Sequence, residues 1–321
     1  MNGVLNINKP AGVTSFDVVA KIRKELGIKK IGHAGTLDPM ATGVLVMCLS
    51  EATKLVPYLM DGEKEYRACL KLGEETTTED RTGEVIQKND FSRVREKDVY
   101  EVFQSFVREV EQVPPVISAL KYKGKPLYKY AREGNPITPE ARKIWVHELH
   151  IEKINLPFVH FLIRCGKGTY VRSLCRDIGR ALKVGGHLFE LQRTRSGSFR
   201  IEESIALDEV EKGKDMPIMS MVDALKDIPS FTVHNLSLSK IKNGGQPHWD
   251  DFIRDSLFWG QPQKEAVPKR DCLIIKNGDV VRLLTKSHEL LALAEMCCDY
   301  SELSTYSSRN PCMNLLRVFN D

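Results

Sequence analysis

An eight-residue segment near the start of the chain, Gly32-His33-Ala34-Gly35-Thr36-Leu37-Asp38-Pro39, most restricts how this chain can fold. Glycine adopts backbone angles that other residues avoid, and proline fixes its own φ and has no amide hydrogen to donate. A segment of this composition cannot continue a helix or a central strand. It lies between an amphipathic stretch and an apolar run, so we expect an irregular loop between a helix and a buried strand.

The residues on either side of this loop support that expectation. Thr14 or Ser15 can cap a helix whose apolar residues follow at helical spacing, and Gly27 is a suitable end for it. Residues 44–49 are apolar and rich in branched side chains, as a short buried strand is. A brief helix over residues 51–57 should follow and end near the proline.

Further along, strand and helix patterns alternate. Residues 66–72 and 159–165 alternate apolar and polar side chains, which predicts half-buried strands, and Gly73 closes the first. Residues 98–109 and 171–182 have apolar positions at helical spacing. The mixture predicts a mixed α/β (α+β) domain.

The pattern changes beyond Pro229. Short apolar runs separated by turn residues take over, at 272–275, 280–284, 290–293 and 315–319. Such spacing is typical of a small domain rich in β-strands. We therefore expect two domains, residues 1–230 and residues 231–321.

The composition indicates a soluble globular protein. Hydrophobic residues make up 42% of the chain and charged residues 28%, and no apolar run approaches the ~20 residues of a membrane span. The N-terminus lacks the basic and apolar regions of a signal peptide, so we expect a cytoplasmic protein. The eight cysteines include no C-x-x-C pair, so we expect reduced thiols and no metal site.

Positive charge is concentrated in two segments. Residues 116–135 carry five basic side chains against one acidic, and residues 164–200 carry nine against two. The net charge of the whole chain is only +4, so the remaining residues are acidic overall. Arg172, Arg176 and Arg180 recur every four residues and would form a basic stripe along one helix face. This distribution indicates a surface that binds a polyanion.

The ordered motifs of residues 1–200 resemble those of the TruB family of tRNA pseudouridine synthases. The matching blocks are Lys9-Pro10-Ala11-Gly12-Val13-Thr14-Ser15, the Gly32 to Pro39 segment, Lys64-Glu65-Tyr66, Leu72-Gly73 with Thr76, Thr78, Asp80 and Gly83, Gln112-Val113-Pro114-Pro115 with Ser118-Ala119 and Lys121, Lys167-Gly168-Thr169-Tyr170-Val171-Arg172-Ser173-Leu174, and Leu191-Gln192-Arg193-Thr194-Arg195-Ser196-Gly197. A match of so many ordered blocks is highly specific. The sequence departs from the family at Thr77, where Asp is common, and at Gln192, where Arg is common.

The resemblance implies a pseudouridine synthase fold with a largely antiparallel sheet over residues 1–230. Within it, residues 114–142 are broken up by prolines and glycines and are similar to the insertion that grips the T-stem and loop of tRNA. Residues 231–321 resemble a small PUA-like RNA-binding domain. Residues 243–270 are longer and less regular than that domain's pattern.

The implied activity is isomerisation of the T-loop uridine at tRNA position 55, with Asp38 as the catalytic aspartate. The reaction breaks the N1–C1′ bond and rejoins uracil through C5, without net redox change or outside group transfer, so we expect no cofactor. The uridine must first be flipped from its stack, at a cost of about a few kcal/mol. Asp38 before Pro39 would alone indicate a structural turn. Attack at C1′, attack at C6 and glycal formation all remain open.

Two residues should complete the catalytic set. Arg172 matches the family arginine that pairs with the aspartate, and it would stabilise and orient the ionised carboxylate; its alternative role is a phosphate contact. Tyr66 matches the family tyrosine that lies against the target base and could take a proton from the sugar; its alternative is core packing. Substrate-contacting positions are matched by His33, Asp80, Tyr170 and Leu191. The alternative role for Asp80 is that of an ordinary turn carboxylate. The alternative role for Leu191 is packing in the core.

Contacts with the RNA backbone are expected from Lys121, Lys123, Lys125, Lys129, Arg132, Arg176 and Arg193. In the insertion these cations alternate with tyrosines, at positions 122, 128 and 130. Alternating cations and aromatic rings suit a segment that follows a backbone and stacks bases. A solvated loop with incidental charge is the alternative.

We expect tRNA as the partner, no obligate protein partner, and a monomer. Two other functions stay open. One is a guide-RNA-dependent synthase, which the long insertion over residues 114–142 disfavours. The other is a tRNA-binding folding factor in which catalysis is secondary.

Overall fold

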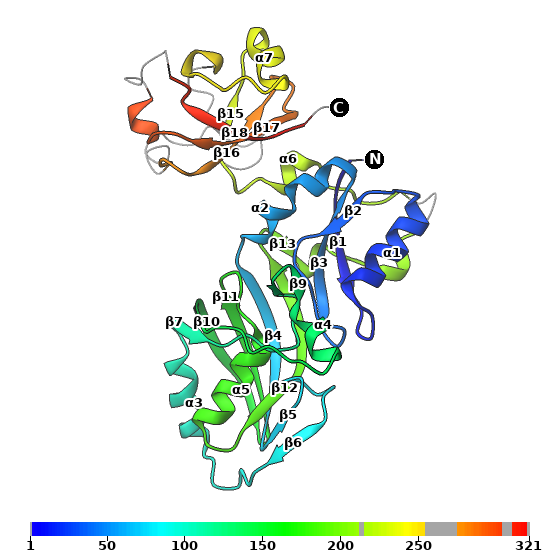
Figure 1. The fold of residues 1–321 in the computed structure, drawn as a ribbon, viewed down its shortest axis with the longest axis vertical. Helices are drawn as coiled ribbons and strands as arrows, with labels where there is room; N and C mark the ends of the chain where they lie inside the picture. Colours follow the sequence, from blue (N-terminus) through cyan, green and yellow to red (C-terminus); the bar gives the residue numbers. More distant parts are fainter. Residues whose placement is uncertain (1, 212–214, 254–274, 304–309, 320–321) are drawn as a thin grey trace. The chain divides into compact units, whose positions relative to one another are not determined.

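The computed structural model of the protein describes residues 2–211, 215–253, 275–303 and 310–319. The chain forms two compact units (Figure 1). The first comprises Leu5–Cys48 and Val56–Met216, and the second comprises Met1–Val4, Leu49–Leu55 and Pro217–Asp321. The domain boundary expected between residues 230 and 231 stays a prediction.

A large mixed sheet forms the centre of the first unit. Its strands are β1 (Gly3–Lys9), β2 (Ile31–His33), β3 (Thr42–Leu49), β4 (Lys64–Leu72), β7 (Arg108–Gln112), β10 (Arg142–Asn155), β11 (Phe158–Cys165), β12 (Gly186–Ser196), β13 (Phe199–Arg200) and β14 (Ile205–Ala206). The order is β14-β1-β3-β12-β4-β11-β10-β7, with β13 beside β12 and β2 beside β3. From β12 to β7 all neighbours are antiparallel, whereas β1/β14 and β3/β12 are parallel. The predicted mixed α/β fold with a largely antiparallel sheet is confirmed.

Helices and two small hairpins complete this unit. The helices are α1 (Ser15–Leu26), α2 (Val56–Met60), α3 (Glu96–Ser105), α4 (Leu127–Arg132) and α5 (Val171–Ala181), with 3-10 turns η2 (Ile201–Glu203) and η3 (Leu207–Glu209). The 3-10 turn η1 (Ser50–Leu55) belongs to the second unit. The hairpins are β5 (Glu74–Thr76) with β6 (Val85–Lys88), and β8 (Lys121–Tyr122) with β9 (Lys125–Pro126). In Figure 1, α3 and α5 lie across the sheet, and Phe103 of α3 packs edge-on against Phe161 of β11 at 5.4 Å between ring centroids. Both rings are buried and belong to the core of the unit.

Several local predictions are confirmed at the residue level. Thr14 caps α1 and forms a capping box with Asp17, and Gly27 ends the helix at a φ of 67°. The strand predicted before Gly73 is β4, and the glycine has a φ of 89°. The strand predicted over 159–165 is β11.

Two boundaries were wrong. The brief helix does not end near Pro57, because α2 continues to Met60 with the proline in its first turn, where no amide donor is needed. The helix predicted over 98–109 ends at Ser105, and the chain enters β7 at Arg108, whose φ is 84°. Pairing of β7 with β10 overrides the helical pattern there.

The second unit contains a four-stranded sheet in the order β15-β16-β17-β18. Its elements are β15 (Ser230–Thr232), β16 (Val280–Leu284), β17 (Leu290–Met296), β18 (Met313–Val318), α6 (Met221–Ala224), α7 (Leu238–Lys242), η4 (Asn235–Ser237), η5 (Trp249–Asp251) and η7 (Tyr300–Glu302). Phe231 lies at the centre of an aromatic cluster with Trp249, Phe252 and Tyr300. The predicted strand at 272–275 and much of 243–270 lie outside the described residues.

The described residues answer three further questions from the sequence. Seven cysteines are free thiols there, and Cys272 lies outside. No described group of three or more His, Cys, Asp or Glu could hold a metal ion. No described helix is long and apolar enough to cross a membrane.

The close approach of β3 to β12 makes Gly43 a sharp test of the fold. Gly43 has a φ of 101°, and a Cβ there would lie 2.2 Å from the Arg193 carbonyl oxygen. Gly43→Ala should therefore lower the free energy of unfolding by about 2 to 4 kcal/mol. Urea denaturation measures it.

Gly166→Ala is the matched control. Gly166 has no positive φ, and its nearest neighbours would be 3.6 Å from the added Cβ. Equal stability losses in the two variants would contradict this account of the strand contact.

Candidate active site

The Asp38 loop, residues 34–41, runs from the end of β2 to the start of β3. Gly35 has a φ of 110°, a region open mainly to glycine. The Ala41 amide donates to the Asp38 carbonyl at 3.1 Å and closes a turn, and the Gly12 amide donates to the Pro39 carbonyl at 2.8 Å. The irregular loop predicted from the sequence is confirmed.

Lys9, the last residue of β1, is fully buried against this loop. Its ammonium donates hydrogen bonds to the carbonyl oxygens of Pro10 at 2.9 Å, Val13 at 2.8 Å and Pro39 at 3.3 Å. Burial lowers the pKa of Lys9 to about 8, and the charge of Asp38 opposes that shift. A buried ammonium needs such acceptors in place of water. Lys9 thus joins a strand, a turn and the loop.

Ser15 and Arg193 hold other parts of the loop. The Ser15 hydroxyl accepts from the Leu37 amide at 2.9 Å and donates to the Leu37 carbonyl at 3.2 Å. Arg193 is only 1% exposed, and its guanidinium donates to the carbonyls of Gly35 at 3.0 Å and Val44 at 2.7 Å. This burial gives Arg193 a supporting role for the loop, and the RNA-backbone contact expected of it stays a prediction.

Arg172, the second residue of α5, pairs with Asp38. Its Nη2 donates to Asp38 Oδ1 at 3.2 Å, and its Nε lies 2.9 Å from Oδ2. The guanidinium also donates to the carbonyls of Thr78 at 3.0 Å and Ile117 at 3.1 Å. The Arg172 side chain is 5% exposed, whereas that of Asp38 is 32% exposed. The arrangement orients the Asp38 carboxylate and leaves it open to the cleft, as a nucleophile or base requires.

Asp80 lies beside Arg172, on the turn between β5 and β6. Its Oδ2 is 4.0 Å from the Arg172 Nε, and its side chain is buried. Its Oδ1 accepts from the Thr78 hydroxyl at 2.7 Å and from the Thr82 amide and hydroxyl at 2.9 and 2.6 Å. Asp80 therefore orders its own turn and also places a second carboxylate near the guanidinium.

Tyr66 and Leu191 lie on the neighbouring strands β4 and β12 and point to the same face of the sheet. Register places Arg193 opposite Tyr66 and Leu191 opposite Ala68, so side chains at these positions share a face. Burial raises the pKa of the Tyr66 phenol, and the charge of Arg193 opposes the shift. Tyr66 is therefore protonated at neutral pH.

A cleft of about 610 Å³ brings together five of the seven predicted catalytic and substrate-contacting residues: Asp38, Tyr66, Tyr170, Arg172 and Leu191. Asp80 and His33 are not among its lining residues. His33 lies in β2, half-buried, and burial lowers the pKa of its imidazole, as does the charge of Arg193. An uncharged imidazole is therefore the main form at neutral pH.

The basic stripe on α5 faces carboxylates of the protein itself. Arg172 meets Asp38, Arg176 is paired with Glu79, and Arg180 pairs with Glu75 at 2.7 Å. The Arg176 side chain is only 11% exposed. The RNA-backbone contact expected of Arg176 stays a prediction. The sequence pattern could not reveal its pairing with Glu79, because Glu79 lies about a hundred residues away in the chain.

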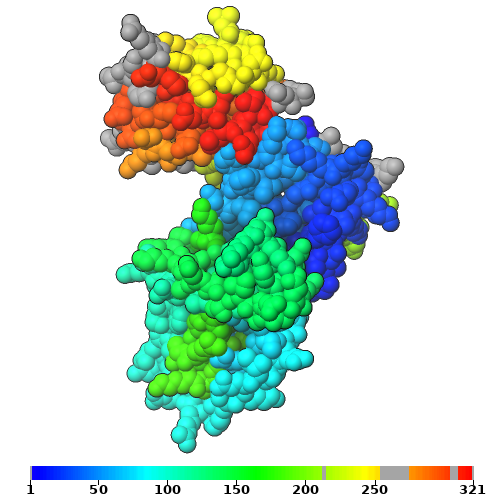
Figure 2. Space-filling model, viewed as in Figure 1, coloured from blue at the N-terminus to red at the C-terminus, as the bar shows by residue number. Residues whose placement is uncertain are grey.

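The insertion over residues 114–142 folds into the β8–β9 hairpin followed by α4. Lysine and arginine groups lie over its tyrosine rings, Lys123 on Tyr122 at 5.4 Å, Lys125 on Tyr130 at 4.6 Å and Arg132 on Tyr128 at 5.5 Å. Lys125 also pairs with Glu133, whereas Lys121, Lys123, Lys129 and Arg132 are exposed. Figure 2 shows this green segment at the surface of the viewed face.

Sequence reasoning did not assign roles to three residues that shape the cleft. Lys9 and Ser15 hold the loop, and Lys64 donates to the carbonyls of Met60 and Gly62 at the cleft rim. Burial lowers the pKa of Lys64 to about 8. All three lie inside motif blocks, which was the only available signal, since burial of a lysine cannot be read from local sequence.

Family models match most of the first unit and the start of the second. The model of the N-terminal domain of TruB family pseudouridylate synthases matches residues 23–171, and that of the tRNA pseudouridylate synthase B C-terminal domain matches residues 172–219.

Curated relatives are similar over most or all of the chain. The tRNA pseudouridine synthase B of Clostridium tetani is 50% identical over 76% of this chain and 85% of its own length. That of Geobacter sulfurreducens is 41% identical, with 100% of both chains covered.

Solved structures are similar as well. A chain from the crystal structure of a Cbf5-Nop10-Gar1 complex matches with a TM-score of 0.76 and 28% identity, covering 98% of this chain and 84% of that chain. A chain from the structure of an H/ACA RNP bound to a substrate RNA containing 2′-deoxyuridine matches with a TM-score of 0.73 and 27% identity. The match covers 99% of this chain and 85% of that chain.

Replacement of Lys9 tests the anchoring of the loop. Lys9→Met leaves three buried carbonyls without their donor, which should destabilise the protein by about 1 to 3 kcal/mol. Because the pKa of Lys9 is about 8 in the folded chain and 10.5 for a free lysine, the unfolded chain binds more protons between these values. The stability of the wild type relative to Lys9→Met should therefore rise as pH increases from 8. Urea denaturation at several pH values measures this.

Lys97→Met, at an exposed position of α3, is the control. Its stability relative to the wild type should not follow pH in this range. If the difference in stability between the wild type and Lys9→Met did not change with pH, this would contradict the conclusion that burial lowers the pKa of Lys9.

Proposed function

The chain belongs to the TruB family of pseudouridylate synthases, and from this premise we propose that it isomerises the T-loop uridine of tRNA at position 55 to pseudouridine, with Asp38 as the catalytic carboxylate. The single observation that carries this proposal is the pairing of Asp38 with the buried Arg172 at the base of the cleft. A fixed, ionised carboxylate is the group that the reaction needs at the ribose or the base.

The geometry supports a division of roles. Arg172 pairs with the Asp38 carboxylate and aims it into the cleft, while Asp80 near the Arg172 Nε helps to hold the guanidinium. Tyr66 offers a protonated phenol beside the target base, so it can donate a hydrogen bond before any proton is taken from the sugar. Leu191 supplies an apolar surface for uracil, and His33 and Tyr170 supply rings against the flipped nucleotides.

The reaction proceeds without net change in composition. The N1–C1′ bond of uridine breaks, uracil turns within the cleft, and a C5–C1′ bond forms while the C5 hydrogen leaves as a proton. A cleft of about 610 Å³ has the volume to hold the flipped nucleoside. Its lining by Asp38, Tyr66 and Arg172 supports this chemistry.

The insertion supports tRNA as the substrate. Four exposed cations on the hairpin and α4, three tyrosine rings, and the neighbouring cleft suit a strand that is held by its phosphates and bases. We propose that Lys121, Lys123, Lys129 and Arg132 contact the T-arm backbone, and that the chain acts on tRNA as a monomer without a guide RNA. The PUA-like C-terminal domain is proposed as a second RNA contact.

Replacing Asp38 tests catalysis. Asp38→Asn keeps the size of the side chain but removes its negative charge, so pseudouridine formation should fall by at least about 10³-fold while tRNA binding changes little. Tritium release from C5 of uridine in a transcript measures the reaction, and filter binding measures affinity. Asp90→Asn, at an exposed turn, should retain full activity. Product formation by Asp38→Asn at the wild-type rate would refute the assignment.

Replacing two exposed lysines tests the insertion. In the double variant Lys121→Ala and Lys123→Ala, the dependence of log affinity on log salt should flatten by about one unit for each phosphate that no longer meets a lysine. Binding titrations of tRNA over a range of salt measure the slope. The control is Lys88→Ala with Lys97→Ala, where both lysines face glutamates of the protein. An unchanged slope in the Lys121→Ala and Lys123→Ala variant would show that these lysines of the insertion do not contact the RNA backbone.

A further inference from the structure

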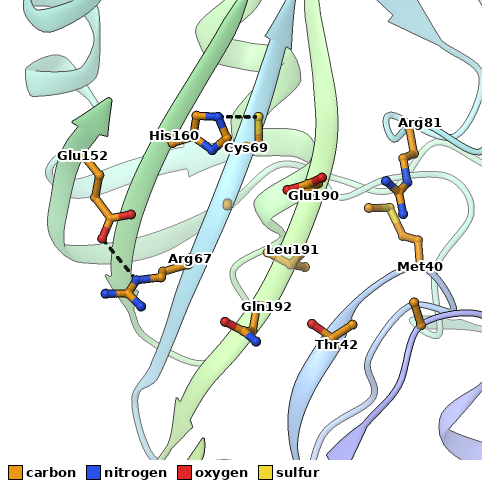
Figure 3. Close-up of a pocket in the computed structure, with 12 residues that line it drawn as sticks. Met40, Thr42, Arg67, Cys69, Arg81, Glu152, His160, Glu190, Leu191 and Gln192 are labelled. Atoms are coloured by element: carbon orange, nitrogen blue, oxygen red, sulfur yellow. Dashed lines mark hydrogen bonds and ion pairs between the residues drawn. The ribbon is translucent and has the colours of Figure 1, made fainter. Parts of the chain in front are cut away.

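A second cavity lies on the face of the sheet opposite the Asp38 cleft. On β12, Leu191 and Arg193 face the cleft, and because strand side chains alternate, Glu190 and Gln192 point to the other face. There they line a cavity of about 400 Å³, which we call the back-face cavity, together with Arg67 and other side chains. Figure 3 shows most of its labelled residues on neighbouring strands, with Met40 in the Asp38 loop and Arg81 in the turn between β5 and β6.

The back-face cavity is lined by polar and apolar groups in similar measure, and its charged groups are of mixed sign. Ala11 and Met40 contribute apolar side chains, and Ala68 and Leu191 also line the cavity although their side chains point to the cleft face. The charged lining residues are two arginines and two glutamates, Arg67, Arg81, Glu152 and Glu190, so the cavity carries no excess of positive charge. A polyanionic backbone gains little there, in contrast to the insertion. A flat, largely uncharged ring with polar edges fits better.

Four polar side chains of the cavity form two pairs with each other. Arg67 donates to Glu152 at 3.1 Å, and the Cys69 thiol lies 3.9 Å from His160 Nε2, as the dashed lines in Figure 3 mark. These pairs close one side of the cavity. In its pair Arg67 uses one of its five N–H donors, and its side chain is 62% exposed.

The other side presents polar groups without protein partners. The carboxylate of Glu190 and the amide of Gln192 have no hydrogen-bond or ion-pair partner among the described residues, although both line the cavity. Across from them, Arg81 stacks on the Phe189 ring at 5.6 Å and likewise has no carboxylate partner among the described residues. Three recognition groups of different chemistry are thus available to one ligand.

We propose that the back-face cavity binds a guanine mononucleotide. A carboxylate accepts two hydrogen bonds side by side, and among the four RNA bases only guanine presents two adjacent N–H donors on its Watson–Crick edge. Glu190 pairs with that edge, Gln192 bonds an acceptor or hydroxyl of the nucleoside, and the ring lies against the Met40 side chain. The Arg81 guanidinium binds the phosphate.

The site bears on catalysis through β12. Leu191 lines both the back-face cavity and the Asp38 cleft, so one strand separates the two ligands. A nucleotide held by Glu190 and Gln192 fixes the two neighbours of Leu191 in the chain. Binding of guanine nucleotide should therefore alter the KM for RNA, while the chain without nucleotide retains its basal activity.

The test is calorimetric titration of the full chain with guanosine monophosphate (GMP), guanosine, AMP and CMP. We expect binding of GMP and weaker or absent binding of AMP and CMP. Glu190→Gln should weaken GMP by at least about tenfold, the size of one lost charge-assisted hydrogen bond. Arg81→Ala should lower the affinity for GMP to about that for guanosine, and it should leave the affinity for guanosine itself unchanged. Glu148→Gln, on β10 outside the cavity, is the matched control.

Folding of each variant is checked by its pseudouridine formation without nucleotide, which should equal that of the wild type. Absence of heat with GMP at millimolar concentration would overturn the proposal. So would equal affinity for GMP, AMP and CMP, or GMP binding that Glu190→Gln leaves unchanged. A negative result for nucleotide binding would not affect the assignment of Asp38, because the titration requires no catalysis.

Discussion

The rest of the site depends on the capture of backbone carbonyls in the Asp38 loop by buried side chains. Lys9 holds the Pro39 carbonyl, Ser15 bonds both polar groups of Leu37, and Arg193 holds the Gly35 carbonyl. A loop that contains glycine and proline has few hydrogen bonds of its own, so these donors replace the water that burial removes. These donors fix the position of the Asp38 carboxylate, and a second element must then supply its cationic partner.

That other element is α5, whose arginines face carboxylates along its length. Burying a guanidinium is costly unless it is paired and hydrogen-bonded, and Arg172 meets this condition with Asp38 and two carbonyls. The same rule accounts for Arg176 with Glu79 and Arg180 with Glu75. The α5 stripe is therefore part of the fold, whereas Lys121, Lys123, Lys129 and Arg132 of the insertion are exposed.

The pleat of the sheet separates two kinds of chemistry. On one face, Tyr66 and Leu191 border a cleft with a charged pair at its base. On the other face, the neighbouring residues of β12 line a cavity of mixed charge with unpaired hydrogen-bonding groups. A shift in register by one residue would exchange these faces, so the antiparallel pairing of β4 with β12 determines where each side chain acts.

The sequence by itself determined the local elements and the family. Capping at Thr14, the glycine end of α1, the strand before Gly73 and the cleft residues Asp38, Tyr66 and Arg172 follow from short-range pattern or from motif resemblance. Only the tertiary structure decided which cations are available. The sequence could not show that Arg176 and Arg193 are largely buried against protein groups, or that Lys9 supports the Asp38 loop, because a side chain's burial depends on partners distant in sequence. Long-range pairing, rather than residue type, decided whether each charge supports the fold or faces solvent.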